Sequence, residues 1–522
     1  MSAGTEAELG VYLDALASKG ASSSDDSTEA ILMSKAYQGR LLMAQGKWTE
    51  ALPCLQLAVE GARGLCNSSA ENKFLWTGFL CEVGAELAST LDYLGDVNGA
   101  EAMYNELLSS RPSGTFLGDY AIFLHRRKRD FAQAEAFYVR ALQLHPHQSS
   151  VHLKYAGFLR HVKKDLKGAD AAYRMAIETD KTNADAIGSY ASFLHGVLGK
   201  IEMAGELYAE AIKQDTFHAN NLCNYGLFLS EEKGKYALAE ELYKRALTHS
   251  PRHANTLYNY AVMLDSHLGR KHEAEDLYRR SLEVEPKHAF ALYNLAVLLE
   301  DKVSAQERSE DRLAKQQAGG GGGGGGVQAP PTIEARLVKR QEVAALYARA
   351  VDCDPKDATT TADYGRYLLT RIEDADKAEE VLFKAAQLDP DNAVAVYNLA
   401  LLLHRHRGNL SGAEALLSKL AHKHVASLQL LARVQLDKFR ASQDQRDLED
   451  CLLNFQRAME QLKDPALCML EYLKVVLESG SNRQRVRAMG AVEACMGAKK
   501  VARETDVRAM INNVKKLAEK AA

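Results

Sequence analysis

The stretch HANTLYNYAVMLDSHLGRKHEAEDLYRRSLEVEPKHAFALYNL, residues 253–295, contains the unit from which most of the chain is built. Its first half carries apolar residues at the i, i+3, i+4, i+7 spacing of an amphipathic helix, namely Leu257, Tyr260, Ala261 and Leu264. Gly269 then ends this helix, a second helix follows with the same spacing, and Pro286 marks its exit. The stretch therefore predicts a helical hairpin.

The hairpin recurs with a period of 35 residues. The first helix repeats an aromatic position, occupied by Tyr120, Tyr155, Tyr190, Tyr225 and Tyr260, and then by Leu295. The next position is always small, from Ala121 to Ala296, and the second helix repeats an alanine and a tyrosine, as in Ala274 and Tyr278. Small residues let helices approach closely while the aromatic side chain fills the space beside them. Such a period predicts an all-α fold, an α–α solenoid in which each hairpin buries its neighbour's face.

The period also divides the chain. The spacing from Leu295 to Tyr364 is 69 residues instead of 35, so one repeat carries 34 extra residues, including eight consecutive glycines at 319–326. The helix-prone flanks of this insertion predict an elongated helix pair with a flexible tip. We expect a disordered acidic tail (1–30), degenerate hairpins (31–112), a regular array (113–301), the insertion (302–341), a resumed array (342–421) and a non-repeat helical cap (422–522).

Composition narrows the function classes. The 522 residues are 46% hydrophobic and 26% charged, with a net charge of −4, which argues against broad nucleic-acid binding. The eight scattered cysteines form no Cys-x-x-Cys pair, and the first ten residues lack an apolar signal core, so we expect a cytoplasmic protein. The basic run HRRKR at 125–129 keeps a nuclear location open.

Chemistry-bearing motifs are missing from the sequence. We find no nucleophile elbow, phosphate loop, zinc-protease motif or kinase set, and the GxGxxG match lies inside the polyglycine. The His-x-His pairs at 145/147, 404/406 and 422/424 have no carboxylate or thiol nearby in sequence, so solvated histidines are favoured over metal ligands. The sequence therefore predicts a protein that is not an enzyme and needs no cofactor or metal.

The unit resembles the tetratricopeptide repeat family through Tyr258-Asn259-Tyr260-Ala261, Gly269, Ala274, Tyr278 and Pro286, with equivalents over about residues 34–421. The resemblance implies a right-handed superhelix whose first helices line the concave side. Asn259 lies ten residues before Gly269, one more than is usual in the family, so the extra residue falls in or just after the first helix. The 35-residue period is also shared by pentatricopeptide RNA readers, and the second helix resembles that of RNA-processing half-a-TPR scaffolds.

One stripe of the first helix is not needed for stacking. It carries asparagines that are 35 residues apart, with tyrosines and apolar residues beside them: Asn224, Asn259, Asn294 and Asn398; Tyr258, Tyr293 and Tyr397; Val262 and Val297. An asparagine amide can pair with the backbone of an extended peptide whatever its sequence, and tyrosine is common at interface hot spots. The stripe is similar to the asparagine ladder in the repeat domain of O-GlcNAc transferase. Alternatively, these asparagines simply orient the helices.

These features predict a scaffold or adaptor that binds an extended partner peptide in the concave groove. The alternatives are an RNA-processing repeat protein and a targeting or regulatory subunit of an enzyme complex. A carboxylate clamp for acidic tails is not completed, because Thr359 and Asp363 occupy the slots that need Lys and Arg. Residues 483–520 hold ten Lys/Arg against four Asp/Glu and could contact a second, acidic partner, or the last helix could mediate oligomerisation.

Overall fold

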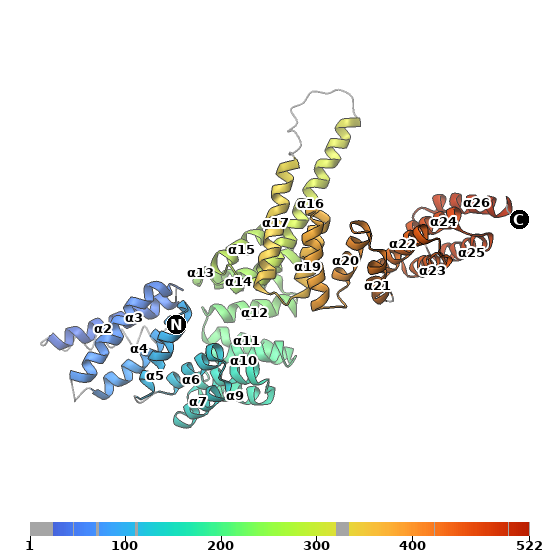
Figure 1. Cartoon of the computed structure of the whole chain (residues 1–522). Coiled ribbons are helices and arrows are strands. Elements are labelled where there is room, and N and C mark those ends of the chain that lie inside the picture. Colours follow the sequence, from blue (N-terminus) through green and yellow to red (C-terminus); the bar gives the residue numbers. More distant parts are fainter. Residues whose placement is uncertain are drawn as a thin grey trace. The chain divides into compact units, whose positions relative to one another are not determined.

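A computed structural model describes residues 24–44, 46–68, 73–109, 113–319, 333–421, 423–499 and 501–520. All regular structure in these ranges is helical (Figure 1), which confirms the predicted all-α helical solenoid. The contacts divide the chain into an N-terminal unit, Met1–Asn259, and a C-terminal unit, Tyr260–Ala522. The predicted tail lies mostly outside the described residues, although helix α2 already begins at Ser24.

The N-terminal unit is a stack of antiparallel hairpins, each made of two consecutive helices that contact each other. The pairs are α2 (Ser24–Ala44) with α3 (Trp48–Ser68), α4 (Lys73–Leu94) with α5 (Val97–Leu108), α6 (Gly114–Phe123) and the π-helical turn η1 (Leu124–Lys128) with α7 (Phe131–Leu144), α8 (Ser149–Phe158) and η2 (Leu159–Lys163) with α9 (Leu166–Thr179), α10 (Ala184–Gly196) with α11 (Ile201–Gln214), and α12 (Ala219–Glu231) with α13 (Tyr236–His249). Helix α14 (Ala254–Ser266) spans the boundary between the units.

The C-terminal unit continues the hairpins and then departs from them. It contains α15 (Lys271–Val284), α16 (Ala289–Gly319) with α17 (Ile333–Cys353), α18 (Ala358–Tyr367) and η3 (Leu368–Ile372) with α19 (Ala375–Leu388), and α20 (Ala393–Arg405) with α21 (Leu410–Leu420). The non-repeat end consists of α22 (Val425–Ser442), α23 (Gln445–Gln461), α24 (Ala466–Ser479), α25 (Asn482–Ala498) and α26 (Glu504–Lys520). Helix α26 buries Val507 and Val514 against α24 and α25, so this apolar face is used inside the unit.

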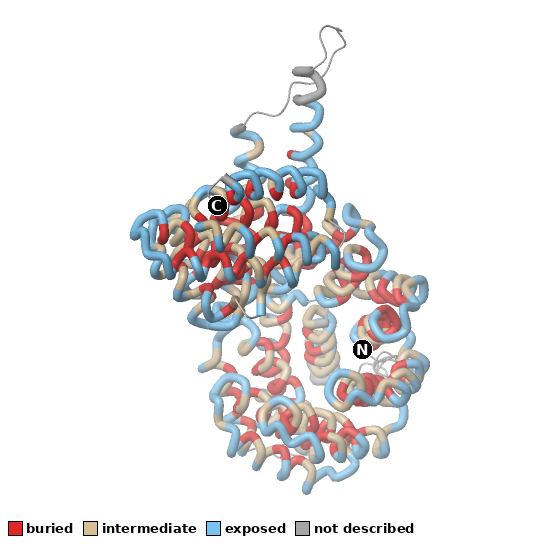
Figure 2. Tube along the Cα trace, turned by 90° about the vertical axis from the view of Figure 1, so that its right-hand side faces the viewer, coloured by how far each residue is buried: buried red, intermediate tan, exposed pale blue. Residues whose placement is uncertain are grey.

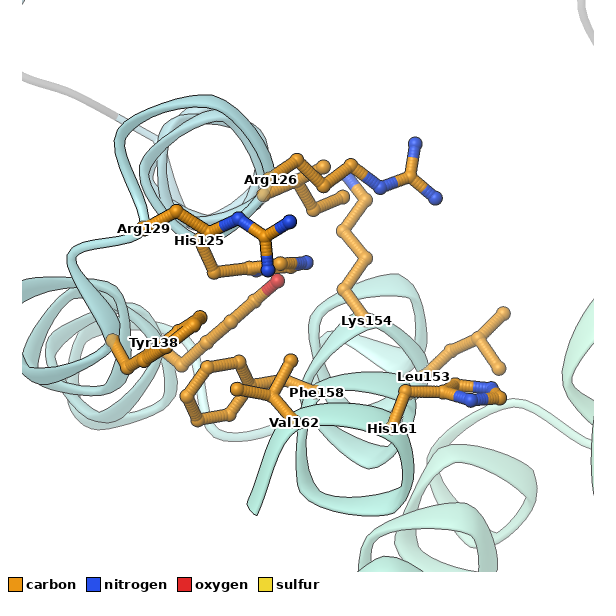
Figure 3. Close-up of a pocket in the computed structure, with 12 residues that line it drawn as sticks. His125, Arg126, Arg129, Tyr138, Leu153, Lys154, Phe158, His161 and Val162 are labelled. Atoms are coloured by element: carbon orange, nitrogen blue, oxygen red, sulfur yellow. The ribbon is translucent and has the colours of Figure 1, made fainter. Parts of the chain in front are cut away.

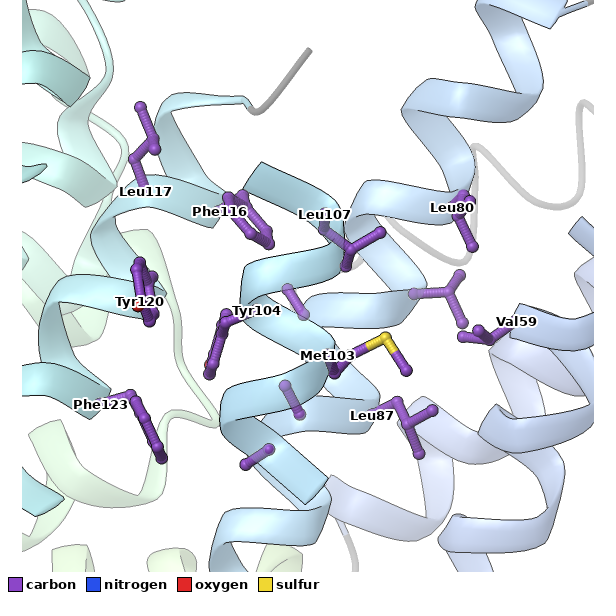
Figure 4. Packing of buried hydrophobic residues seen from close by; sticks show 14 of the residues in the cluster. Val59, Leu80, Leu87, Met103, Tyr104, Leu107, Phe116, Leu117, Tyr120 and Phe123 are labelled. Carbon is purple, nitrogen blue, oxygen red and sulfur yellow. The ribbon is translucent and has the colours of Figure 1, made fainter. Parts of the chain in front are cut away.

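The recurring aromatic residues form the core between helices. Tyr104 of α5 lies 5.7, 5.0 and 5.3 Å, between ring centroids, from Phe116, Tyr120 and Phe123 of α6 (Figure 4). Small residues such as Ala121 are fully buried beside these rings. Buried positions lie on the sides of the helices that face each other, whereas the outward sides are exposed (Figure 2). The aromatic and small residues that repeat every 35 positions are thus the residues through which the helices pack.

The extra residue of the 35-residue period is visible where some first helices end. Helices α6, α8 and α18 pass into π-helical turns, in which one additional residue is accommodated per turn. Each π-helical turn is followed by a residue in the left-handed conformation: Arg129 (φ 57°), Lys164 (φ 57°) or Glu373 (φ 63°). Six other first helices in the described ranges end instead at a glycine with positive φ, as at Gly199 and Gly269. Three repeats therefore keep a charged side chain where glycine is favoured.

Replacing Lys164 with glycine should raise the free energy of unfolding by up to about 1 kcal/mol. A non-glycine residue with this φ is strained by about 1–2 kcal/mol, and the greater entropy of unfolded glycine offsets part of the gain. Chemical denaturation of the variant and of the matched Glu373→Gly variant would measure the effect. Destabilisation in both variants would show that the side chains, rather than the turn geometry, stabilise these sites.

The extended helix pair lies in the C-terminal unit. Helix α16 has 31 residues and α17 has 21, against 13 and 14 in α12 and α13. Arg336 of α17 forms ion pairs of 2.9 and 3.1 Å with Glu310 and Asp311 of α16, and residues 320–332 between the helices lie outside the described residues. At the base, Arg340 contacts Glu307 at 2.8 Å and donates to the carbonyl of Arg371 at 3.0 Å. The base of the insertion is therefore part of the packed fold.

Histidines 35 residues apart cap the first helices. Nδ1 of His218 accepts a hydrogen bond from the Asn221 amide at 3.3 Å, and His253 and His288 do the same for Thr256 and Ala291 at 3.2 Å. A capping acceptor of this kind satisfies one of the free amides of a helix N-terminus. The histidines therefore belong to the turns between repeats.

Two of these caps should titrate differently. The hydrogen bond from His218 Nε2 to Asp185, 2.9 Å long, raises the pKa of His218, whereas burial and the charge of His218 lower the pKa of His253. Because the folded pKa of His218 is raised, this bond contributes fully to stability below the unfolded pKa of about 6.5, and its contribution is lost as pH rises through the raised pKa. NMR titration should place the pKa of His218 above that of His253, and Asp185→Asn should reduce the difference by lowering the pKa of His218. An unchanged His218 pKa in that variant would contradict this origin.

Candidate functional site

The first helices contact one another along the stack of the N-terminal unit. Helix α4 contacts α6, α6 contacts α8, α8 contacts α10, and α10 contacts α12. Among the described helices of this unit, the second helices make no contacts of comparable extent with one another. A stack that is close-packed along one row of helices and open along the other curves toward the close-packed row. The first helices therefore line the inner side of this unit, as the tetratricopeptide resemblance implies.

We call the positions equivalent to Tyr258, Asn259 and Val262 in each first helix the groove stripe. Asn224, Asn259 and Tyr258 are half-buried, between the buried stacking positions and the exposed outer surface. Nδ2 of Asn259 lies 3.4 Å from Sγ of Cys223, which connects α14 to α12. The side chain of Asn224 makes no hydrogen bond to any residue in the described ranges. The two asparagines of this unit thus differ in hydrogen bonding: the Asn259 amide contacts Cys223, whereas the Asn224 amide makes no bond to a described residue.

The predicted site residues of the C-terminal unit also differ from one another in exposure and hydrogen bonding. Asn294, Tyr397 and Val262 are half-buried, and Val297 is 37% exposed. The hydroxyl of Tyr293 donates a 2.9 Å hydrogen bond to Asp363, so only its ring remains for a partner.

Asn398 differs from the prediction. It is only 6% exposed, and its Nδ2 donates to the carbonyl of Val394 one turn earlier at 2.8 Å. An asparagine that is buried and bonded within its own helix cannot contact a peptide in the groove. We therefore exclude Asn398 from the candidate site, although it occupies the same position in the sequence period as the others.

The groove stripe also holds charged residues in the N-terminal unit. Lys154 of α8 and Asp119 of α6 occupy the asparagine slot of consecutive repeats, and they form an ion pair of 2.7 Å. Lys154 Nζ lies at the edge of a pocket with a volume of about 640 Å³ between the pairs α6–α7 and α8–α9 (Figure 3). The pocket is lined by Ile122, His125, Arg126, Arg129, Phe131, Tyr138, Leu153, Lys154, Gly157, Phe158, His161 and Val162. Leu153, Lys154 and Gly157 are the equivalents of Tyr258, Asn259 and Val262 three periods earlier, so the pocket belongs to the groove stripe.

The polar groups of this pocket are donors. No aspartate or glutamate lines it. Burial and the nearby Arg126 lower the pKa of His125, and burial, followed by the charges of Arg160 and Lys164, lowers that of His161. Burial raises the pKa of Tyr138 well above its usual value, so its hydroxyl keeps its proton. At neutral pH the pocket therefore presents arginines, a lysine, neutral imidazoles and a phenol, which suits a negatively charged ligand.

This pocket was not predicted from the sequence. The run HRRKR by itself indicates only a possible import signal, and Gly157 carries no signal of its own in the sequence. The sequence does contain one sign of a basic pocket. The basic segments HRRKRD (125–130) and RHVKKD (160–165) are 35 residues apart and lie at the ends of consecutive first helices. Repeats in register bring such segments to the same edge of the stack. In the described ranges, no group of three or more His, Cys, Asp or Glu could hold a metal ion, and no helix is long and apolar enough to cross a membrane.

Comparison with known proteins identifies the repeats. The tetratricopeptide repeat model matches residues 86–149 and 231–283, and no curated protein matches the chain. Similar solved structures include human IFIT1 in a dimer with m7Gppp-AAAA (14% identity, 73% of this chain and 90% of that one, TM-score 0.43). They also include pilF of Pseudomonas aeruginosa (19%, 47% and 94%, 0.36) and YrrB, described as a TPR protein with an unusual peptide-binding site (20%, 44% and 98%, 0.30). Residues 86–149 and 231–283 are therefore similar to tetratricopeptide repeats, and the described helices form hairpins of the kind that such repeats form.

Proposed function

We propose that the chain is a non-enzymatic scaffold that holds an extended segment of a partner protein along the groove stripe. The observation that carries the proposal is the half-buried row of amides and aromatic rings on first helices whose other faces are buried. Such a row has side chains that remain accessible, yet it stands on helices that the stack keeps rigid. A rigid row of this kind lowers the entropy lost on binding.

The chemistry of the row fits a peptide backbone. Each asparagine amide offers one acceptor and two donors, and each bond it makes to a peptide contributes about 1 kcal/mol net. Asn224 supports the proposal most directly, because it makes no hydrogen bond to a described residue. Asn259 contributes less, since its Nδ2 already lies 3.4 Å from Sγ of Cys223. Tyr258 and the ring of Tyr293 add apolar area at the positions between the amides.

Affinity purification with a matched pair of variants tests the proposal. The first variant is Asn224→Ala/Asn259→Ala/Asn294→Ala on the groove stripe. The control is Gln133→Ala/Gln214→Ala/Gln387→Ala, which removes three exposed amides from second helices. We expect the groove variant, and not the control, to lose its protein partners. Equal partner sets would show that the asparagines are structural, and recovery of RNA in place of protein would contradict the peptide proposal.

A further inference from the structure

We propose that the basic pocket between α6–α7 and α8–α9 holds a phosphoryl group carried by the partner segment. The inference rests on the proposed function, because the pocket belongs to the groove stripe on which the segment would lie. It adds a chemical requirement, since the partner would be recognised when one of its side chains is phosphorylated. Four features of the pocket carry the argument: a buried hydroxyl, two arginines, a glycine and a strained turn.

The buried hydroxyl belongs to Tyr138. Its side chain is fully buried, and its oxygen finds no hydrogen-bond partner among the described residues. The equivalent tyrosine Tyr104, by contrast, has a partner, because its hydroxyl lies 3.4 Å from Ser89 Oγ. Figure 3 shows the hydroxyl directed into the space near Arg129 and His125, where a ligand oxygen would satisfy it.

The two arginines stand apart from their neighbours in the same turn. Arg127 pairs with Asp92 at 2.6 Å, and Lys128 pairs with Glu101 at 2.8 Å, so both of these charges are neutralised within the fold. Arg126 and Arg129 line the pocket, and neither forms an ion pair with a residue in the described ranges. The cations left without a protein carboxylate are thus those that face the cavity.

Gly157 keeps the cavity open. A Cβ placed on this residue would meet nothing within 4 Å, so the space beside it is empty rather than filled by a neighbour. The equivalent positions in other repeats are larger, including Val262 and Val297. Glycine within a helix is unfavourable compared with these residues, and a packing reason for it is absent here. The empty space beside Gly157 belongs to the pocket that Arg126 and Arg129 also line, and it therefore points to an occupant.

Arg129 adds the fourth feature. It adopts φ 57° at a turn where six other described repeats use glycine, and so keeps its side chain at the cost of backbone strain. Lys164 adopts the same conformation one repeat later but does not line the pocket. This difference provides a matched control, because both residues can be replaced by glycine with the same effect on the turn.

The donor set favours a phosphoryl group over a carboxylate. Arg126, Arg129 and Lys154 supply three positive charges, of which Lys154 is shared with Asp119. Tyr138, His125 and His161 supply neutral donors. A phosphoryl dianion offers three acceptor oxygens to such a set, whereas a carboxylate offers two and half the charge. The net charge of −4 on the whole chain opposes a long polyanion, which favours one phosphorylated side chain over RNA.

Isothermal titration calorimetry on the full chain tests the proposal with N-acetyl-phosphoserine amide and inorganic phosphate as probes. We expect both to bind, and Arg129→Gly and Gly157→Val each to weaken binding by about tenfold or more. Tyr138→Phe should weaken it less, and Lys164→Gly should have the smallest effect, because Lys164 does not line the pocket. Circular dichroism and thermal melting of each variant would establish that it is folded, and Arg129→Gly should melt no lower than wild type because it relieves the strained turn.

Several results would overturn the inference. Binding that is insensitive to both Arg129→Gly and Gly157→Val would place the anion elsewhere. Acetate binding as tightly as the phosphorylated probe would make the pocket a carboxylate site, and tighter binding of a 5′-phosphorylated RNA oligonucleotide would make it a nucleic-acid site. The groove proposal is tested separately, because Asn224→Ala should weaken partner capture and leave phosphate binding unchanged. Phosphate binding without partner loss in the asparagine variant would therefore uphold the pocket and refute the groove.

Discussion

Replacing Arg366 with alanine should lower the free energy of unfolding of the C-terminal unit by about 3 kcal/mol. Arg366 holds Glu300 with two hydrogen bonds of 2.8 Å, and the carboxylate also accepts a 2.9 Å bond from the Tyr347 hydroxyl. The side chain of Glu300 is only 13% exposed, so its charge has little water to replace the guanidinium. Removing one partner of a buried ion pair leaves an uncompensated charge, which typically costs 3–5 kcal/mol.

The matched control is Arg440→Ala in the same unit. Arg440 pairs with Asp437 and Glu478 at 3.1 and 3.4 Å, but its side chain is 53% exposed. Exposed pairs of this kind contribute less than about 1 kcal/mol. Urea denaturation should therefore separate the two variants clearly, and adding Glu300→Gln to Arg366→Ala should recover part of the loss. Equal destabilisation by the two arginine variants would contradict the role assigned to burial.

Replacing Tyr208 with alanine should cost the N-terminal unit about 3–5 kcal/mol, the usual range for removing a buried aromatic side chain. The ring is 2% exposed, and its centroid lies 5.9 and 5.5 Å from those of Tyr225 and Phe228 in the next repeat. The substitution therefore leaves a cavity between two hairpins.

Tyr208→Phe is the control, because it keeps the buried ring and removes only the hydroxyl, so it should cost much less than Tyr208→Ala. Because contacts in a solenoid are mainly between neighbours, hydrogen exchange should increase most in α10–α13 after Tyr208→Ala. Uniform exchange over the whole unit would show that its repeats unfold as a single cooperative block.

The fold could be predicted from the sequence because its determinants repeat. Tyr208 and Ala191 hold positions that recur every 35 residues, and a repeated apolar position indicates the same buried contact each time. The end of the chain was also predictable where local signals are strong. Pro465 precedes α24 and Gly480 follows it, and these are residue types that favour the start and the end of a helix.

The candidate site was less predictable, because the period gives the helix face but not the neighbours of a side chain. Asn224, Asn259 and Asn398 share one position in the repeat. The first makes no hydrogen bond to a described residue, the second contacts Cys223, and the third bonds the carbonyl of Val394. These differences arise from rotamers and from residues that do not repeat, and a sequence pattern does not determine either.

The basic pocket depends on the same kind of non-repeating detail. Its space requires Gly157 where other repeats carry larger side chains, and Ile122 borders it where another repeat has Ser192. Each is a single departure from the period, and departures are difficult to distinguish from variation in one sequence. Only the structure shows that both departures, with Arg126 and Arg129, border one cavity.

Site-specific photocrosslinking tests most directly the claim that partners lie along the groove stripe. A benzophenone amino acid would be placed at Leu227 and Val297 on first helices, and at Val139 and Leu238 on second helices, all four being half-buried or exposed apolar positions. We predict crosslinks to an extended partner segment from Leu227 in the N-terminal unit and from Val297 in the C-terminal unit, and none from Val139 or Leu238. Crosslinks that are equal on both faces, or stronger from the second helices, would contradict the assignment of the groove as the binding surface.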